Sequence, residues 1–141
     1  MNDGDQARDQ AGVRAGERLG PGERLKSKRE FERTRREGKR AGDTVLRVLV
    51  ARNGLAWPRL AAAIPRRYGP AVARNRLRRL YAEAFRREKT RLPPGVDVVL
   101  SPPPGAGPPD LPTLRAALVR LVTQAAARLP RSGPPPAAGP S

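Results

Sequence analysis

Residues 65–91 read PRRYGPAVARNRLRRLYAEAFRREKTR, and this stretch decides the fold of the chain. Apolar residues recur in it at intervals of three and four, which is the spacing of one stripe along an α-helix. The stripe comprises Ala73, Leu77, Leu80, Tyr81 and Ala84. Pro70 suits the first turn of a helix, and Pro93-Pro94-Gly95 ends the pattern. We therefore expect a helix from Ala71 to about Arg91.

The same stretch is the most basic part of the chain, with ten Lys and Arg residues against two Glu residues. At about 100° per residue, the stripe centred on Leu77 and Ala84 faces away from a polar face. That face carries Asn75, Arg78, Arg79 and Arg86, with Arg74 and Arg76 at its borders. Arginines four residues apart on a helix repel each other by about a few tenths of a kcal/mol. An anionic partner is therefore expected, and we predict that this face binds nucleic acid; the alternative is an ordinary solvated helix.

Two more helices are predicted, one on each side of this stretch. Ser27 and Glu30 have the spacing of a capping box, and Gly38 stops the pattern, so KREFERTRREG is expected to be helical. Residues 111–129 show a final helical stripe. Its aligned residues are Leu114, Leu118, Leu121 and Val122.

Three segments have the composition of strands. Two of them are the mostly apolar residues 44–52 (TVLRVLVAR) and 57–64, and the turn signal Asn53-Gly54 lies between them. A β-hairpin is therefore predicted. Pro58 weakens the start of its second strand. Residues 96–101 (VDVVLS) form a short third strand. The expected order is α-β-β-α-β-α, an α/β fold of the α+β sandwich type with a small central sheet and helices packed on it.

The two ends of the chain differ in composition from the middle. Residues 1–20 contain only Val13 and Leu19 as large apolar residues, and residues 131–141 are mostly Pro, Gly, Ala and Ser. Such segments bury too little apolar surface to offset chain entropy. We predict two disordered tails flanking a single domain at residues 21–130.

The charge of the chain points to a polyanionic partner. It has 29 Lys and Arg residues, 25 of them Arg, against 13 Asp and Glu residues, and a net charge of +16. Displacing phosphate counterions supplies much of the free energy of such binding. The excess of Arg suits bidentate phosphate contacts and stacking on bases, and a GC-rich genome explains it equally well.

The absence of Cys and His excludes most protein-based nuclease chemistry. Thiolate and imidazole nucleophiles, imidazole acid-base catalysis and zinc fingers all need these residues. The carboxylates Glu30, Glu37, Glu83 and Glu88 lack convergent spacing and are interpreted as caps and surface pairs. We therefore expect no catalytic and no metal-binding residues. No apolar segment is long enough for a membrane span, and a cytoplasmic protein is expected.

The segment YGPAVARNRLRRLYAEAF resembles the signature of the bacterial ribonuclease P protein component. The family pattern is a Gly-x-Ala-Val-x-Arg-Asn-Arg core followed by a basic pair and an aliphatic-aromatic helix. RLKSKREFERTRREGKR is similar to the opening of the same family, and the resemblance extends over residues 24–122. It implies an α/β sandwich with an uncommon left-handed β-α-β crossover, which periodicity does not reveal.

The resemblance also implies a function and partners. In this family a catalytic RNA subunit removes the 5′ leader of precursor tRNA by endonucleolytic cleavage with Mg²⁺ bound mainly through RNA. The protein assists by binding the catalytic RNA and the leader, and neither a membrane nor a small-molecule substrate is involved. A structural RNA-binding protein of the ribosomal or nucleoid type and a self-sufficient metal-dependent nuclease are the alternative interpretations.

The resemblance assigns site residues by position. Contacts to RNA are implied for Arg74, Asn75, Arg76, Arg78 and Arg79. Arg66, Arg67 and Arg86 are further predicted to bind RNA. Phe31 and Arg35 are implied for a cleft that holds the 5′ leader, although Phe31 is equally well a core residue. Tyr68 is a further candidate for this cleft; the alternative is that it covers the start of the helix. Arg35 stands where many relatives have a second aromatic residue, and Pro65 and Pro70 replace polar residues. Trp57 and Tyr81 lie in apolar elements and are predicted to be core.

Overall fold

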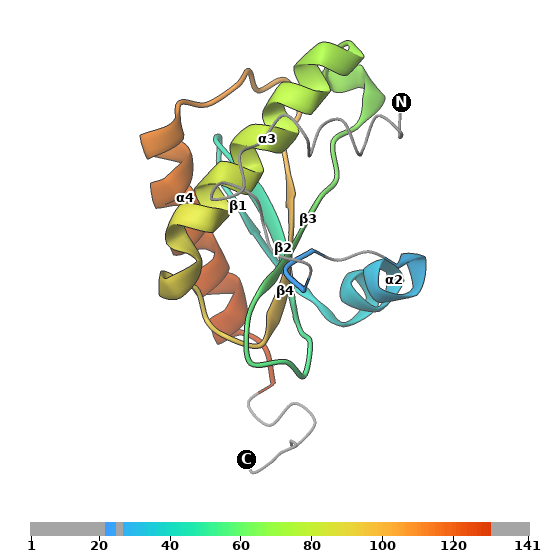
Figure 1. Ribbon diagram of the computed structural model, residues 1–141, viewed down its shortest axis with the longest axis vertical. Helices are drawn as coiled ribbons and strands as arrows, with labels where there is room; N and C mark the ends of the chain where they lie inside the picture. The colour runs from blue at the N-terminus through green and yellow to red at the C-terminus, as the bar shows by residue number, and fades with distance from the viewer. Residues whose placement is uncertain (1–21, 25–26, 131–141) are drawn as a thin grey trace.

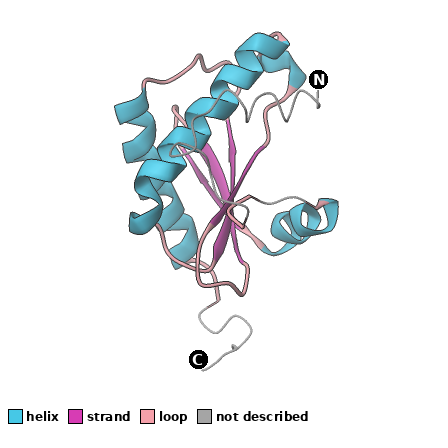
Figure 2. Cartoon of the chain, in the orientation of Figure 1, coloured by secondary structure: helices cyan, strands magenta, loops and turns pink. Residues whose placement is uncertain are grey.

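The computed structural model describes residues 22–24 and 27–130, and its four strands form one mixed sheet. The strands are β1 (Lys39–Gly42), β2 (Arg47–Arg52), β3 (Arg59–Ala62) and β4 (Val96–Ser101). Their order across the sheet is β1-β2-β4-β3, with β4 antiparallel to β2 and parallel to β3. Within the described residues the order of helices and strands is α-β-β-β-α-β-α (Figure 2).

The predicted hairpin is wrong, because β2 and β3 do not pair with each other. They lie on either side of β4, which occupies the centre of the sheet. Residues Val96 to Leu100 are buried on both faces, which is typical of a central strand with a continuous apolar run. β1 was not expected, since the sequence KRAG is short and has no alternating apolar pattern.

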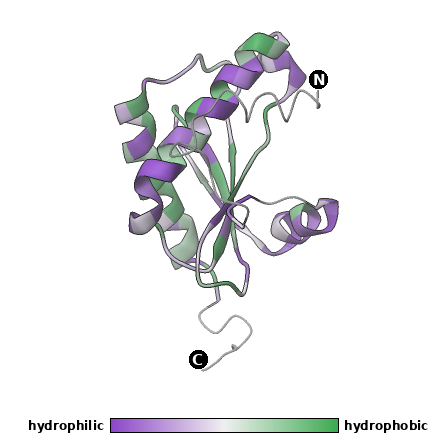
Figure 3. Ribbon diagram, in the orientation of Figure 1, coloured by the Kyte–Doolittle hydropathy of each residue, from purple (hydrophilic) through white to green (hydrophobic). Residues whose placement is uncertain are grey.

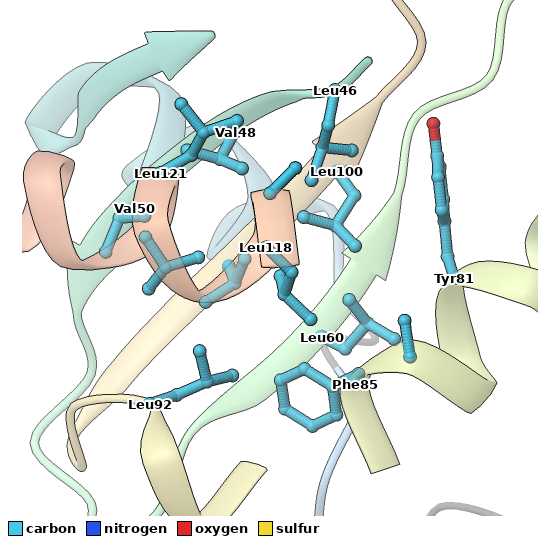
Figure 4. Packing of buried hydrophobic residues seen from close by; sticks show 14 of the residues in the cluster. Leu46, Val48, Val50, Leu60, Tyr81, Phe85, Leu92, Leu100, Leu118 and Leu121 are labelled. Carbon is cyan, nitrogen blue, oxygen red and sulfur yellow. The ribbon is translucent and has the colours of Figure 1, made fainter. Parts of the chain in front are cut away.

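The helices cover the two faces of the sheet unequally (Figure 1). α3 (Ala71–Glu88) and α4 (Leu111–Ala127) lie on one face, and α2 (Lys28–Glu37) lies on the other. The larger core is on the α3 and α4 side (Figure 4), where Val48 and Val50 of β2 and Val98 and Leu100 of β4 meet Phe85 and the α4 stripe. Burial of this apolar surface, at about 25 cal/mol per Å², is the main stabilising contribution to the fold.

The α2 side of the sheet has a much smaller apolar cluster. Leu49 and Val99 form it, and Phe31, Ala61 and Ala63 pack against it. Alternate residues of β2 and β4 point to opposite faces, so Arg47, Leu49 and Asp97 share this side. Figure 3 shows hydrophilic residues over much of α2 and α3.

The three predicted helices are present with nearly the expected bounds. Ser27 and Glu30 form the predicted capping box, with Ser27 Oγ accepting from Glu30 N at 3.0 Å. The stripes of α3 and α4 are buried, including Leu77, Tyr81 and the four aligned residues of α4. Pro70 is the N-cap of α3 and not part of its first turn. η3 (Lys89–Arg91), a 3₁₀ turn, continues α3 to the predicted end.

Trp57 is more exposed, and Glu88 more buried, than the sequence predicted. Trp57 is 44% exposed and is not a core residue; its Nε1 donates to Gly22 O at 2.7 Å. Glu88 is buried within the apolar face of α3 and is not a surface pair. Its carboxylate accepts from Arg115 Nε of α4 at 2.5 Å, which links the two helices.

The structure does not test the predicted tails or the predicted handedness of the crossover. The predicted tails at 1–20 and 131–141 lie outside the described residues. The parallel strands β3 and β4 are connected through α3, and the left hand of this crossover stays a prediction. Among the residues described, no helix combines the length and apolarity needed to cross a membrane.

Candidate nucleic-acid interface

Arg74, the first arginine of the Arg-Asn-Arg tripeptide, stabilises the turn that precedes α3 through a hydrogen bond. η2 (Arg66–Tyr68) is a short 3₁₀ turn that carries the exposed Arg66 and Arg67. Arg74 is half-buried, and its Nη1 donates to the backbone oxygen of Gly69 at 2.7 Å. Gly69 lies two residues before the start of α3. Arg74 therefore has a structural contact as well as a place on the basic face, and it holds η2 against α3.

The next residues of α3 form the exposed part of the basic face. Asn75 Oδ1 accepts a hydrogen bond from Arg78 Nη1 at 2.8 Å, which orients the Arg78 guanidinium along the helix. Arg76 and Arg79 are exposed. The predicted face is thus present on the N-terminal half of α3, opposite the buried Leu77 and Tyr81.

The C-terminal half of α3 is less available to an anion, because Glu83 binds two of its arginines. Arg86 donates to Glu83 from Nε at 3.2 Å and from Nη2 at 3.0 Å, and Arg87 Nε donates to the same carboxylate. Hydrogen bonds from Arg86 and then Arg87 hold the pKa of Glu83 below its usual value, although burial raises it. Glu83 is therefore ionised at neutral pH and offsets much of the charge of Arg86.

A second cationic surface lies on the α2 side of the sheet. It is a groove of about 420 Å³ whose apolar floor includes Leu49 and Val99. Phe31 of α2 forms one wall, and the Arg35 guanidinium lies over its ring, 5.4 Å from the centroid. Arg40 of β1 and Arg47 of β2 also line the groove. A groove of this kind combines an apolar surface for bases with cations for phosphates.

The structure places two of the three predicted cleft residues in this groove and the third elsewhere. Phe31 and Arg35 line it, and Phe31 also packs on the small apolar cluster. Tyr68 does not line this groove; it lies beside α3, half-buried against the larger core. The two interpretations of Phe31, as a core residue and as a cleft residue, are thus both compatible with its position.

Sequence reasoning missed Arg40 and Arg47. Arg40 pairs with Leu49, and Gly42 pairs with Arg47, so both arginines share the face of the groove floor. For Arg47 the sequence did contain a signal, because Arg47 and Leu49 alternate with Val48 and Val50 and must therefore lie on the same face of the strand. For Arg40 the sequence had no signal, because its orientation depends on the unexpected strand β1.

Two positions along β4 from Val99, a buried carboxylate that the sequence did not reveal links α2 to the sheet. Asp97 is fully buried and accepts from Arg33 Nη2 at 2.9 Å and Asn53 Nδ2 at 2.9 Å. Arg59 donates to both of its oxygens and also to Glu30 Oε2 at 3.0 Å. Hydrogen bonds to Asp97 raise the pKa of Arg59. This ionic cluster fixes α2, and with it Phe31 and Arg35, relative to the strands.

Metal-binding side chains are not assembled in the described part of the chain. No group of three or more Asp or Glu residues there is placed to hold a metal ion. Asp97 and Glu88 are the buried carboxylates, and both are bonded to arginine. Their positive neighbours make them poor ligands for a divalent cation.

The chain is similar in sequence to ribonuclease P proteins from several bacteria. The Ribonuclease P family model matches residues 19–126 of the chain. The ribonuclease P protein component of Thermotoga maritima is 40% identical over 80 residues, which cover 57% of this chain and 68% of that protein. The ribonuclease P protein component of Syntrophobacter fumaroxidans is 38% identical over 95 residues, covering 67% and 80%.

Solved structures agree with the fold. The RNase P protein from Thermotoga maritima matches with a TM-score of 0.66 at 34% identity, covering 72% of this chain and 96% of that chain. The Staphylococcus aureus RNase P protein has a TM-score of 0.63 at 20% identity, covering 75% and 95%, and supports the fold alone. The predicted α+β class, with a small sheet and helices packed on it, is therefore confirmed.

Proposed function

Because the chain belongs to the ribonuclease P protein family and is the protein component of that ribonucleoprotein, we propose that it contacts two RNA molecules through two separate surfaces. The basic face of α3 binds the catalytic RNA. The groove between α2 and the sheet binds the 5′ leader of precursor tRNA. The protein thereby holds the substrate leader close to the RNA that cleaves it.

The observation that carries this proposal is the position of the two cationic surfaces on opposite sides of one sheet. α3 and α2 lie on opposite faces of the sheet, and α3 is on the side of the larger core (Figure 1). The groove on the α2 side is lined by Phe31, Arg35, Arg40 and Arg47. A single RNA segment cannot follow both surfaces without passing around the sheet edge. Two partners, one on each side, use both surfaces at once.

The groove suits a single strand better than a duplex. Leu49 and Val99 give it an apolar surface, and Arg35, Arg40 and Arg47 line it as well. Unstacked bases gain about 1 to 3 kcal/mol each from stacking on aromatic side chains, and Phe31 offers one ring. Arg35 stands where many relatives have a second aromatic residue. Its guanidinium group is planar, and bases also stack on such planes. Arg40 and Arg47 are then positioned for the leader phosphates.

The basic face of α3 suits structured RNA. Arg66, Arg67, Arg76 and Arg79 are exposed along η2 and α3, and arginine binds phosphate in a bidentate manner. Arg74, Asn75 and Arg78 support these contacts through their bonds to the backbone and to each other. Arg86 contributes less charge, since Glu83 binds it.

Catalysis is assigned to the RNA subunit. The chain has no His or Cys, and its described carboxylates form no metal site. Mg²⁺, bound mainly through RNA in the assembled enzyme, would supply Lewis-acid activation of the reacting phosphate. The protein contributes by binding: its net charge of +16 offsets phosphate repulsion between substrate and catalytic RNA.

The test is cleavage of a precursor tRNA by a bacterial ribonuclease P RNA at low Mg²⁺, with and without the full chain. A protein-only reaction is the control. We expect stimulated cleavage at the 5′ maturation site and no cleavage by protein alone. Tight RNA binding without stimulation of a cognate RNA would favour a structural RNA-binding protein, and cleavage by protein alone would contradict the absence of an active site.

A further inference from the structure

The loop between β2 and β3 exposes an uncharged run that the proposed function does not use. Residues 54–57, Gly-Leu-Ala-Trp, are four consecutive exposed residues, although charged residues make up 30% of the chain. Leu55 is 36% exposed and Trp57 is 44% exposed. Exposed apolar runs of this length are unfavourable in water unless they have a function. The loop is therefore a candidate contact surface.

The ring of Trp57 is held in place by residues 22–24. Its Nε1 donates to Gly22 O at 2.7 Å, and a β-carbon at Gly22 would lie 3.3 Å from Trp57 Cζ2. Gly22 thus lies directly against the ring. The same short segment is bound to β3, since Leu60 N donates to Glu23 O at 2.8 Å. Because the ring is fixed before any partner arrives, binding to it costs little side-chain entropy.

Residues 22–24 also connect Trp57 to the C-terminal end of α3. Lys89, the C-cap of α3, donates from Nζ to Glu23 Oε2 at 2.5 Å, and Glu23 directly follows Gly22. Figure 1 shows α3 running toward the end of the sheet that carries the loop between β2 and β3. α3 has 18 residues and is therefore about 27 Å long. A large RNA bound to the basic face of α3 spans this length and reaches Trp57.

Charge decides between the possible partners of this loop. A second copy of the chain would bring together two molecules that each have a net charge of +16, and like charges repel. An RNA that already contacts the α3 face has the opposite charge and offers unpaired bases. Aromatic side chains bind such bases by stacking. The exposed ring and its connection to α3 therefore favour a base of RNA over a protein surface.

We propose that the indole ring of Trp57 stacks on one unpaired base of the catalytic RNA. This contact rests on the proposed function, because the base belongs to the RNA that the basic face of α3 binds. It is separate from leader binding, since Trp57 does not line the groove of Phe31. Trp57 thus adds an aromatic contact, which is insensitive to salt, to an interface that otherwise depends on arginine and phosphate.

The fluorescence of Trp57 tests this contact in the unaltered full chain, because Trp57 is the only tryptophan in the sequence. Stacking of a base on an indole ring quenches its emission. The probes are ribonuclease P RNA and inorganic polyphosphate, which carries the negative charge without bases. We expect saturating ribonuclease P RNA to quench the emission and saturating polyphosphate to leave it nearly unchanged.

Two variants separate stacking from the hydrogen bond to Gly22. Trp57→Leu loses both the aromatic ring and the N–H group, whereas Trp57→Phe loses the N–H group and keeps a ring. Trp57→Leu should weaken the binding of ribonuclease P RNA at least about fivefold, the smaller end of what base stacking contributes. Trp57→Phe should retain most of the affinity. Neither variant should alter the salt dependence, because no cation is removed, and neither should cause a leader-dependent change in the affinity for precursor tRNA.

Four results would overturn the proposal. Emission that stays constant while ribonuclease P RNA binds would place Trp57 outside the interface. Equal quenching by polyphosphate would make the response an effect of charge. Equal losses of affinity in the two variants would assign the effect to the hydrogen bond with Gly22. A change of emission on concentrating the protein alone would indicate a contact between copies of the chain.

The contact and the proposed function can fail separately. RNA binding and fluorescence do not need cleavage, so a failure to stimulate cleavage would contradict the proposed function and not the stacking of Trp57 on RNA. Stimulated cleavage without quenching would contradict the stacking alone.

Discussion

Arg59 and Asp97 occupy paired positions on the parallel strands β3 and β4, and their side chains form a two-point ion pair. Arg59 Nε lies 2.8 Å from Asp97 Oδ1, and Nη2 lies 2.9 Å from Oδ2. The Asp97 side chain is 0% exposed and that of Arg59 is 13% exposed. Since Arg33 of α2 binds the same carboxylate, one buried charge joins a helix to two strands.

Asp97→Asn is expected to destabilise the protein by about 3 kcal/mol, because it leaves two poorly solvated guanidinium groups short of a negative charge. The matched control is Glu37→Gln. Glu37 lies 3.6 Å from the same Arg33 but is 53% exposed, so its loss should cost about 0.5 kcal/mol or less. Urea unfolding followed by circular dichroism measures both. Equal effects of the two variants would contradict a dominant role for the buried charge.

Replacing Arg76 and Arg79 together by Gln should weaken binding to ribonuclease P RNA and flatten its salt dependence. Each lost phosphate contact reduces the slope of log K against log salt by about 0.7 to 0.9, so a reduction of about 1.4 to 1.8 is expected for two contacts. Arg91 and Arg128 are also exposed; Arg91 lies in η3, after the C-terminal end of α3, and Arg128 is the C-cap of α4. Replacing these two by Gln makes the same change in net charge and should leave the slope nearly unaltered; a similar loss in both double variants would indicate a purely nonspecific effect.

Phe31→Leu should lower the affinity for precursor tRNA without altering the affinity for tRNA that lacks a leader. Leucine keeps the apolar floor but offers no ring, so a loss of about 1 kcal/mol, about fivefold, is expected. Trp57→Leu is the control, since Trp57 is an aromatic residue that is 44% exposed and does not line the groove of Phe31. A drop in stability with no leader-dependent change would make Phe31 a core residue alone.

Glu83→Gln should remove a pH-dependent part of the free energy of unfolding. Arg86 and Arg87 hold the pKa of Glu83 below its ordinary value of 4.5. The ionised group therefore stabilises the fold fully above that pH, and this contribution is lost as the pH falls through the folded-state pKa. The variant should be less stable than the parent at pH 7, and the difference should shrink in acid. A difference that is constant with pH would exclude the ion pairs as its cause.

The helices and β4 were predictable because their signals are local. The capping box of Ser27 and Glu30 involves residues three positions apart, and the stripes of α3 and α4 repeat within single turns. VDVVLS is a continuous strand-forming run between proline-rich segments. In each case neighbouring residues contain the whole pattern, so no knowledge of distant partners is needed.

Strand pairing was not predictable in the same way. Asn53 and Gly54 were interpreted as the turn of a hairpin, but they begin a wider loop in which Gly54 has a φ of +75°. Asn53 uses its side chain to bind Leu55 N at 2.7 Å and Asp97 Oδ1 at 2.9 Å, and its N–H donates to Gly95 O. Gly95 directly precedes β4 and Asp97 lies within it, so Asn53 joins the end of β2 to the central strand. The sequence near Asn53 carries no information about these distant partners.

The sequence by itself determined the helices, the central strand and the basic face of α3, because periodicity and charge along one helix set which residues share a side. Only the tertiary structure decided the order β1-β2-β4-β3, the burial of Asp97 among arginines and the meeting of Phe31 and Arg35 with Arg40 and Arg47. These features depend on contacts between residues far apart in the chain. Their free energy comes from burying apolar surface and pairing charges once the whole sheet has formed.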